Sequence, residues 1–264
     1  MKSILVLLAL IFFQSCSFDN KSGIWINEND GFKTKDNSYK EFKTLSSLDQ
    51  TFNEKIEIDK NFKFNLSKKI INQEWKDIFY NQTNNLDNFN YNNLNQLIFK
   101  SKRITKYTIN DYILFENNNI ISSDQRGNIV VFSVSENKVV NKFNFYKKQY
   151  KEIKKYLNIV VENNIIYVAD NIGYLYAFDY KKNEILWAKN YKVPFRSNIK
   201  ISNNKLISAN LNNDLLFLNK VNGELLATIP TEETIIKNKF INNISITNQY
   251  ILYLNTYGTL YAID

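Results

Sequence analysis

The stretch of sequence that decides the fold is DNIGYLYAFD, at residues 170–179. It recurs as NTYGTLYAID at residues 255–264 and, with substitutions, as SDQRGNIVVF at 123–132 and NLNNDLLFLN at 210–219. We take one turn position as equivalent in the four copies, namely Gly127, Gly173, Asn213 and Gly258. The copies are then 46, 40 and 45 residues apart, a period typical of the blades of a β-propeller.

Each repeat divides into four short strands joined by tight turns. In the second repeat the predicted strands are residues 158–161, 165–169, 174–179 and 185–188. The chain has only two Pro and six Gly, so we expect Asn, which tolerates left-handed backbone, to make most turns. The apolar run IIYVA at 165–169 indicates a strand buried on both faces, as between neighbouring blades.

These observations predict an all-β protein, a β-propeller of four-stranded antiparallel blades. We expect about four blades of a probable eight, at about 97–145, 157–190, 198–230 and 243–264. LIFK at 97–100 is a candidate first strand, and NQEW at 72–75 is a candidate outer strand that closes the ring. The last copy ends at Asp264 in mid-blade, so we expect a fragment, with pairing to another chain as the alternative. A ring of eight would need roughly 160 more residues at this period.

Composition narrows the possible chemistry. There is no His, and the only Cys is Cys16, so the commonest general base and a disulfide within the chain are both excluded. We therefore expect no catalytic residues, no metal site and no cofactor. The net charge is +8, and the densest lysine run lies at 147–155. We interpret this run as a solvated connector rather than a patch for an acidic ligand, and we expect no nucleic-acid partner.

The N-terminus has the features of a secretory signal. Residues 1–15 combine Lys2 with the apolar run ILVLLALIFF at 4–13, which predicts a signal peptide. Residues 16–57 are polar and read as a flexible tether, followed by the partial propeller at 58–264. The alternatives are an uncleaved anchor or an ordinary signal.

Two resemblances follow from these motifs. The sequence QSCS at 14–17 resembles the bacterial lipobox, which implies a lipid on Cys16 and, with Ser17 after it, a place at the periplasmic side of the outer membrane. The motif GYLYAFD followed by ILW resembles the quinoprotein-type propeller repeat. The resemblance implies that Gly173 makes the turn, Ala177 allows close packing and Asp179 and Trp187 hold the repeat's Asp and Trp positions, with the Trp docked on the adjoining blade. Gly258, Ala262 and Asp264 match in the last copy, whereas Phe143 or Ala227 falls near the Trp position and Ser133 or Asn219 replaces the Asp.

Two families share this repeat. Quinone-dependent dehydrogenases need Ca²⁺ and typically a vicinal Cys pair, which this chain lacks. The BamB family of outer-membrane β-barrel assembly lipoproteins has the same order of signal, lipobox, tether and repeats. This resemblance implies a non-catalytic periplasmic scaffold that binds the periplasmic domains of the barrel-inserting protein. VPFRSN at 193–198 matches the family's contact loop, with Val193, Phe195 and Arg196 as an expected exposed contact; in the alternative, Val193 and Phe195 only cover the blade edge. A generic protein- or glycan-binding propeller lipoprotein and a quinoprotein enzyme remain as other readings.

Overall fold

A computed structural model describes residues 63, 66–71, 74–90, 95–97, 99–232 and 241–264, together with two short strands near the N-terminus. The chain divides into two units, residues 1–64 and 65–264. In the first unit β1 (Ser17–Phe18) pairs antiparallel with β2 (Trp25–Ile26). The predicted signal peptide at 1–15, Cys16 and nearly all of the tether at 16–57 lie outside the described residues.

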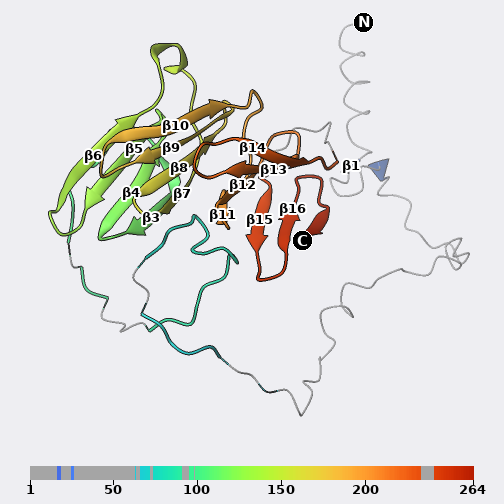
Figure 1. Ribbon diagram of the computed structural model, residues 1–264, viewed down its shortest axis with the longest axis horizontal. Helices are drawn as coiled ribbons and strands as arrows, with labels where there is room; N and C mark the ends of the chain where they lie inside the picture. The colour runs from blue at the N-terminus through green and yellow to red at the C-terminus, as the bar shows by residue number, and fades with distance from the viewer. Residues whose placement is uncertain are drawn as a thin grey trace, which may run out of the picture. The chain divides into compact units, whose positions relative to one another are not determined.

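The second unit consists of antiparallel sheets whose strands follow one another in chain order (Figure 1). Sheet 1 is formed by β3 (Ile109–Glu116), β4 (Asn119–Asp124), β5 (Asn128–Ser133) and β6 (Lys138–Asn144). Sheet 2 is formed by β7 (Leu157–Glu162), β8 (Ile165–Asp170), β9 (Tyr174–Asp179) and β10 (Glu184–Asn190).

Sheet 3 is formed by β11 (Lys200–Ser202), β12 (Lys205–Ala209), β13 (Leu215–Asn219) and β14 (Leu225–Ile229). Sheet 4 is formed by β15 (Asn243–Ile246), β16 (Ile251–Leu254) and β17 (Leu260–Ile263). The described residues contain no α-helix and one 3-10 turn, η1 (Lys148–Tyr150). The fold is a partial β-propeller, which confirms the predicted fold class.

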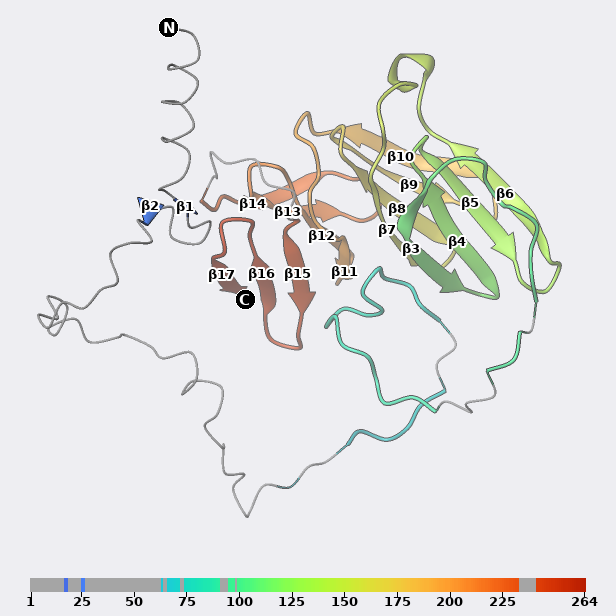
Figure 2. The ribbon, with the colours of Figure 1, turned by 180° about the vertical axis from the view of Figure 1, so that it is seen from behind.

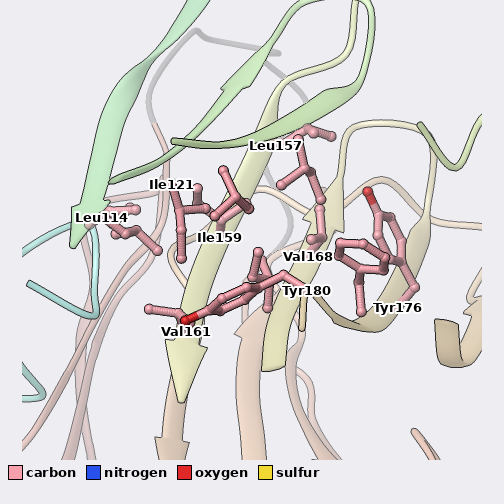
Figure 3. Close-up of a cluster of buried hydrophobic side chains, with 13 residues drawn as sticks. Leu114, Ile121, Leu157, Ile159, Val161, Val168, Tyr176 and Tyr180 are labelled. Carbon is pink, nitrogen blue, oxygen red and sulfur yellow. The ribbon is translucent and has the colours of Figure 1, made fainter. Parts of the chain in front are cut away.

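The two middle sheets are buried on both faces because their side chains alternate between two apolar clusters. In β9, Tyr176 and Phe178 pack between sheets 1 and 2, whereas Leu175 and Ala177 pack between sheets 2 and 3. Figure 3 shows the cluster between sheets 1 and 2, where Leu114 and Ile121 face Ile159. A third cluster, which includes Ile207 and Tyr253, lies between sheets 3 and 4. The continuous apolar strands of the sequence therefore stack the sheets against one another.

Asparagine makes the first hairpin turn in each of sheets 1, 2 and 3. The two central residues have positive φ in all three turns, the geometry of a type I′ hairpin: Asn117 and Asn118, Asn163 and Asn164, Asn203 and Asn204. The turn position taken as equivalent in the four repeats also has positive φ, at Gly127 (85°), Gly173 (106°), Asn213 (67°) and Gly258 (98°). The expectation that Asn makes most turns is confirmed for the first hairpins of sheets 1 to 3, whereas Gly holds three of the four equivalent positions of the repeat.

Two expected strands are wrong. The first strand of sheet 1 begins at Ile109 and not at 97, and residues 99–100 form no strand. Trp75 does not belong to an outer strand, because its backbone pairs with Phe115 in β3, the first strand of sheet 1. Both expectations rest on the local sequence, which does not indicate with which strand a segment pairs.

Within the part of the chain that the structure describes, sheet 4 buries one face only. Ile244 and Tyr253 are buried in the third cluster, whereas Leu254, Leu260 and Ala262 on the other face are exposed. Ala262 therefore lacks the packing of Ala177, its counterpart in sheet 2, within the described residues. Asp264 is exposed as well.

Replacing Gly by Ala at two equivalent turns distinguishes the cost of backbone strain from the cost of a steric contact of the added Cβ. At Gly173 an added Cβ would lie 3.2 Å from the carbonyl oxygen of Val193, whereas at Gly258 it would meet no atom of the described residues within 4 Å. Both residues have positive φ, so each change to Ala costs about 1–3 kcal/mol of backbone strain. We expect Gly173→Ala to lower the free energy of unfolding in urea by about 1 kcal/mol more than Gly258→Ala. Equal losses would show that the contact with Val193 does not matter.

Candidate functional site

The loop that was expected to contact a partner lies between sheets. Phe195 has an exposed fraction of 3%, packs in the cluster between sheets 2 and 3, and meets the Tyr191 ring edge-on at 5.5 Å between centroids. Val193 and Arg196 are half-buried. The expectation of an exposed contact is therefore wrong for Phe195. Its burial is closer to the alternative, in which Val193 and Phe195 only cover the blade edge.

Backbone hydrogen bonds hold this loop against three sheets. The Phe195 N–H donates to the Asp170 carbonyl at 2.9 Å, and the Arg196 N–H donates to the Ala209 carbonyl at 2.8 Å. The Asn242 N–H, next to β15, donates to the Arg196 carbonyl at 2.9 Å. Burial lowers the pKa of the Arg196 guanidinium, since part of its hydration is lost. The loop is thus an inter-sheet connection with Arg196 at the junction of sheets 2, 3 and 4.

The motif residues of the repeat stabilise their own turns. In all four copies an Asp or Asn lies three residues before the turn position. Its Oδ1 accepts hydrogen bonds of 2.8–3.1 Å from the backbone N–H groups two and four residues further along the chain. These four acceptors are Asp124, Asp170, Asn210 and Asn255. Asp179 Oδ1 accepts from the Lys181 and Lys182 N–H groups at the next hairpin. The Oδ1 atoms of these motif residues therefore accept hydrogen bonds from the backbone of their own turns.

Trp187 docks on the adjoining sheet, as the resemblance implied. Its indole Nε1–H donates to the Lys220 carbonyl at 3.0 Å, and its ring covers Gly223, where an added Cβ would lie 2.5 Å from it. Trp187 pairs with Ala177, which lies four residues after the turn glycine of sheet 2. In sheet 1 the residue four positions after the turn glycine is Val131, and it pairs with Asn141. The strand register therefore gives the Trp position of sheet 1 to Asn141 and not to Phe143. The Asn141 amide donates to the Tyr180 carbonyl at 2.9 Å, the same bond in the neighbouring sheet.

A segment outside the repeats contacts the first strand of each of sheets 1 to 4. We call residues 74–85 the strap; it is turquoise in the ribbon views (Figures 1 and 2). The Phe115 N–H of β3 donates to the Trp75 carbonyl at 2.8 Å, and the Val161 N–H of β7 donates to the Lys76 carbonyl at 2.9 Å. The Gln82 amide donates to the Ile201 carbonyl of β11 at 2.7 Å. The Ile246 N–H of β15 donates to the Gln82 carbonyl at 2.8 Å.

A buried ion pair fixes the middle of the strap. Lys200 Nζ lies 2.8 Å from Asp77 Oδ2, and the two side chains have exposed fractions of 0% and 7%. Lys200 also donates to the Asn81 carbonyl at 2.7 Å, and Asp77 Oδ1 accepts from the Phe79 N–H at 2.8 Å. Burial raises the pKa of Asp77 and lowers that of Lys200, because each ion loses hydration, and each partner opposes the shift of the other. No periodic pattern in the sequence predicts this pair, because its members lie 123 residues apart.

The strap also borders a cavity of about 300 Å³. Its lining mixes acidic and basic side chains, among them Glu74, Lys76 and Glu162. Lys76 Nζ lies 2.6 Å from Glu74, and this bond raises the pKa of Lys76. The described residues contain no group of three or more His, Cys, Asp or Glu side chains arranged as metal ligands. The part of the chain described by the structure also has no helix long and apolar enough to cross a membrane.

No family model matches the sequence, and no curated protein does. The computationally designed Ika4 protein is 12% identical and has a similar fold, with a TM-score of 0.51 over 65% of this chain and 100% of its own. BamB from Moraxella catarrhalis is 14% identical, with a TM-score of 0.47 over 60% of this chain and 45% of its own. The C-terminal WD40 domain of Sif2 is 14% identical, with a TM-score of 0.44 over 58% of this chain and 45% of its own.

The chain thus spans less than half the length of the last two structures. At these identities the likeness concerns the fold alone and assigns the chain to no family.

Breaking the ion pair tests whether the strap stabilises the sheets. We expect Lys200→Met to lower the free energy of unfolding by about 3–5 kcal/mol, because it leaves the Asp77 carboxylate buried without its cation. The double variant with Asp77→Leu removes both charges and should be less destabilised than Lys200→Met alone.

Lys220→Met serves as the matched control for the ion-pair variants. In the pair that it removes, Lys220 Nζ lies 2.5 Å from Glu162 Oε2, and the two side chains have exposed fractions of 21% and 33%. Because the pair is partly solvated, its loss should lower the free energy of unfolding in urea by about 1 kcal/mol or less. A loss for Lys200→Met no larger than for Lys220→Met would contradict a structural role of the buried pair.

Proposed function

We propose that this chain is a non-catalytic scaffold of the propeller type that binds a protein partner through its loops and outer strands. The observation that carries the proposal is the strap. The blades of a propeller surround a central channel. In this chain the strands that would line such a channel are the first strands of sheets 1 to 4, and residues 74–85 form hydrogen bonds with each of them. With those strands covered, binding to the described part of the fold falls to the loops and the rim.

The absence of catalysis is part of this proposal. It is supported by the use of the repeat's polar side chains: the oxygens of Asp170, Asp179 and Asn210 accept N–H bonds from their own turns. A catalytic carboxylate needs an oxygen turned toward a substrate. Dye-linked alcohol oxidation by the purified chain, once quinone and Ca²⁺ are added, would contradict it.

The finer proposal concerns location and partner. The signal-like residues 1–15, the lipobox-like Cys16 and the polar tether support a lipid anchor at the periplasmic face of the outer membrane. The same order of segments, followed by propeller repeats, supports a role in outer-membrane β-barrel assembly, with the periplasmic domains of the barrel-inserting protein as partner. Half-buried Val193 and Arg196 remain the candidate contacts, without Phe195.

The burial of Phe195 favours a second candidate. Hot spots of protein interfaces are usually large side chains that a partner can cover, and Phe195 is already covered by sheets 2 and 3. A propeller lipoprotein that binds another protein or a glycan elsewhere on its rim fits this burial equally well.

Charge reversal at Arg196 distinguishes the two candidates. We expect Arg196→Glu to reduce capture of purified periplasmic domains of the barrel-inserting protein by about tenfold or more, because it replaces an interface cation by an anion. The control is Arg103→Glu, which makes the same change at an exposed arginine that precedes sheet 1 in the chain. Equal capture by both variants would exclude the Arg196 contact, and no capture by the unmodified chain would favour the second candidate.

A further inference from the structure

The connection between β6 and β7, residues 145–156, projects beyond the sheets in both ribbon views (Figures 1 and 2). It carries the 3-10 turn η1 and the lysine run at 147–155, which the sequence alone indicated to be a solvated connector. The placement of these lysines around one cavity favours the alternative, a patch for an acidic ligand. A cavity of about 280 Å³ lies at its base. This cavity is separate from the strap and from the 193–198 loop, and the function proposed above makes no use of it.

The lining of this cavity is strongly cationic. Five of its residues carry a positive charge and none carries a carboxylate: Arg126, Lys147, Lys148, Lys151 and Lys155. Two tyrosines and two asparagines complete the lining. The lysines belong to one loop, whereas Arg126 belongs to the turn between β4 and β5, so folding is what brings the charges together.

Two of the cations are fixed in place. Lys155 has an exposed fraction of 1%, donates through Nζ to the Tyr150 carbonyl, and lies 5.2 Å from the centroid of the Tyr146 ring. The Arg126 guanidinium donates to the Lys151 carbonyl and lies 5.6 Å from the centroid of the Tyr107 ring. Aromatic faces and backbone carbonyls hold both groups without neutralising them. The other three lysines are exposed at the rim.

One exposed carboxylate pairs with the cluster, and two buried ones nearby accept hydrogen bonds from other groups. Glu152 lies 3.9 Å from Arg126 but is 85% exposed. Asp124 accepts from Thr105 and from the Asn128 amide, and Asp170 accepts from the Tyr146 hydroxyl at 2.5 Å. Burial, and next the neighbouring Arg126, lower the pKa of Lys155. The cluster therefore holds an excess of positive charge that an incoming anion would relieve.

We propose that this cavity binds a compact phosphate-bearing anion. A phosphate group offers several acceptor oxygens at once, which suits a fixed guanidinium, a fixed ammonium and three mobile lysines better than the two oxygens of one carboxylate do. The volume of about 280 Å³ suits a small phosphorylated molecule or a single lipid headgroup rather than a polymer. Both sources present the same chemistry.

Calorimetric titration of the full chain with pyrophosphate tests this site. We expect binding that weakens as salt is raised, and a loss of affinity of about tenfold or more in Lys148→Gln/Lys151→Gln, which removes two rim charges and leaves Arg126 and Lys155 in place. The matched control is Lys181→Gln/Lys182→Gln, which lowers the net charge equally at two exposed lysines of the β9–β10 turn. It should bind pyrophosphate as the unmodified chain does.

Failure of pyrophosphate to bind, or an equal loss in both double variants, would overturn the proposal. A second titration with glycerophosphoglycerol, the headgroup of an anionic lipid, identifies the source. Binding of this diester with the same sensitivity to Lys148→Gln/Lys151→Gln supports the site with a lipid as its source. Binding of pyrophosphate alone supports the site with a soluble phosphate as its source.

Discussion

The strap is the constraint on which the arrangement of the sheets depends. An unpaired strand edge buried in a protein costs free energy, and a stack of four sheets brings four first strands to one side. Residues 74–85 bond to each of those strands, and the buried pair of Asp77 with Lys200 fixes the crossing point at sheet 3. A segment outside the repeats thus completes a surface that the repeats leave open.

Neighbouring sheets are linked by bonds that recur in register. Buried Glu116, at the end of β3, accepts from the Tyr180 hydroxyl of sheet 2 at 3.0 Å. Glu162, at the end of β7, accepts from Lys220 of sheet 3 at 2.5 Å. Burial, and next the Glu116 carboxylate, raise the pKa of Tyr180 to about 12, so its hydroxyl remains a donor at neutral pH. The repeats therefore keep the place of each link and change the donor from phenol to ammonium.

What the sequence predicted well was local. The hairpins, the asparagine turns and the burial of both faces depend on neighbours within one repeat, and a period in the forties reveals them. What it missed depends on contacts between distant residues. The sequence predicts an outer strand at Trp75 and, as one of two alternatives, an exposed contact at Phe195, and the structure shows neither. It places Phe143 near the tryptophan position, which the register gives to Asn141. No single repeat contains the information on which sheet edge or which core a side chain will reach.

The functional account follows from this arrangement. Because the strap covers the first strands, the binding that we propose falls to the rim and loops of the described fold, and the lysine-rich loop borders a cationic cavity. Hydrogen exchange tests the strap most directly, at the amides of Phe115, Val161 and Ile246, which donate to strap carbonyls. We predict exchange within about tenfold of the slow amides in β8 and β9. Exchange as fast as in unprotected backbone would contradict the role given to the strap.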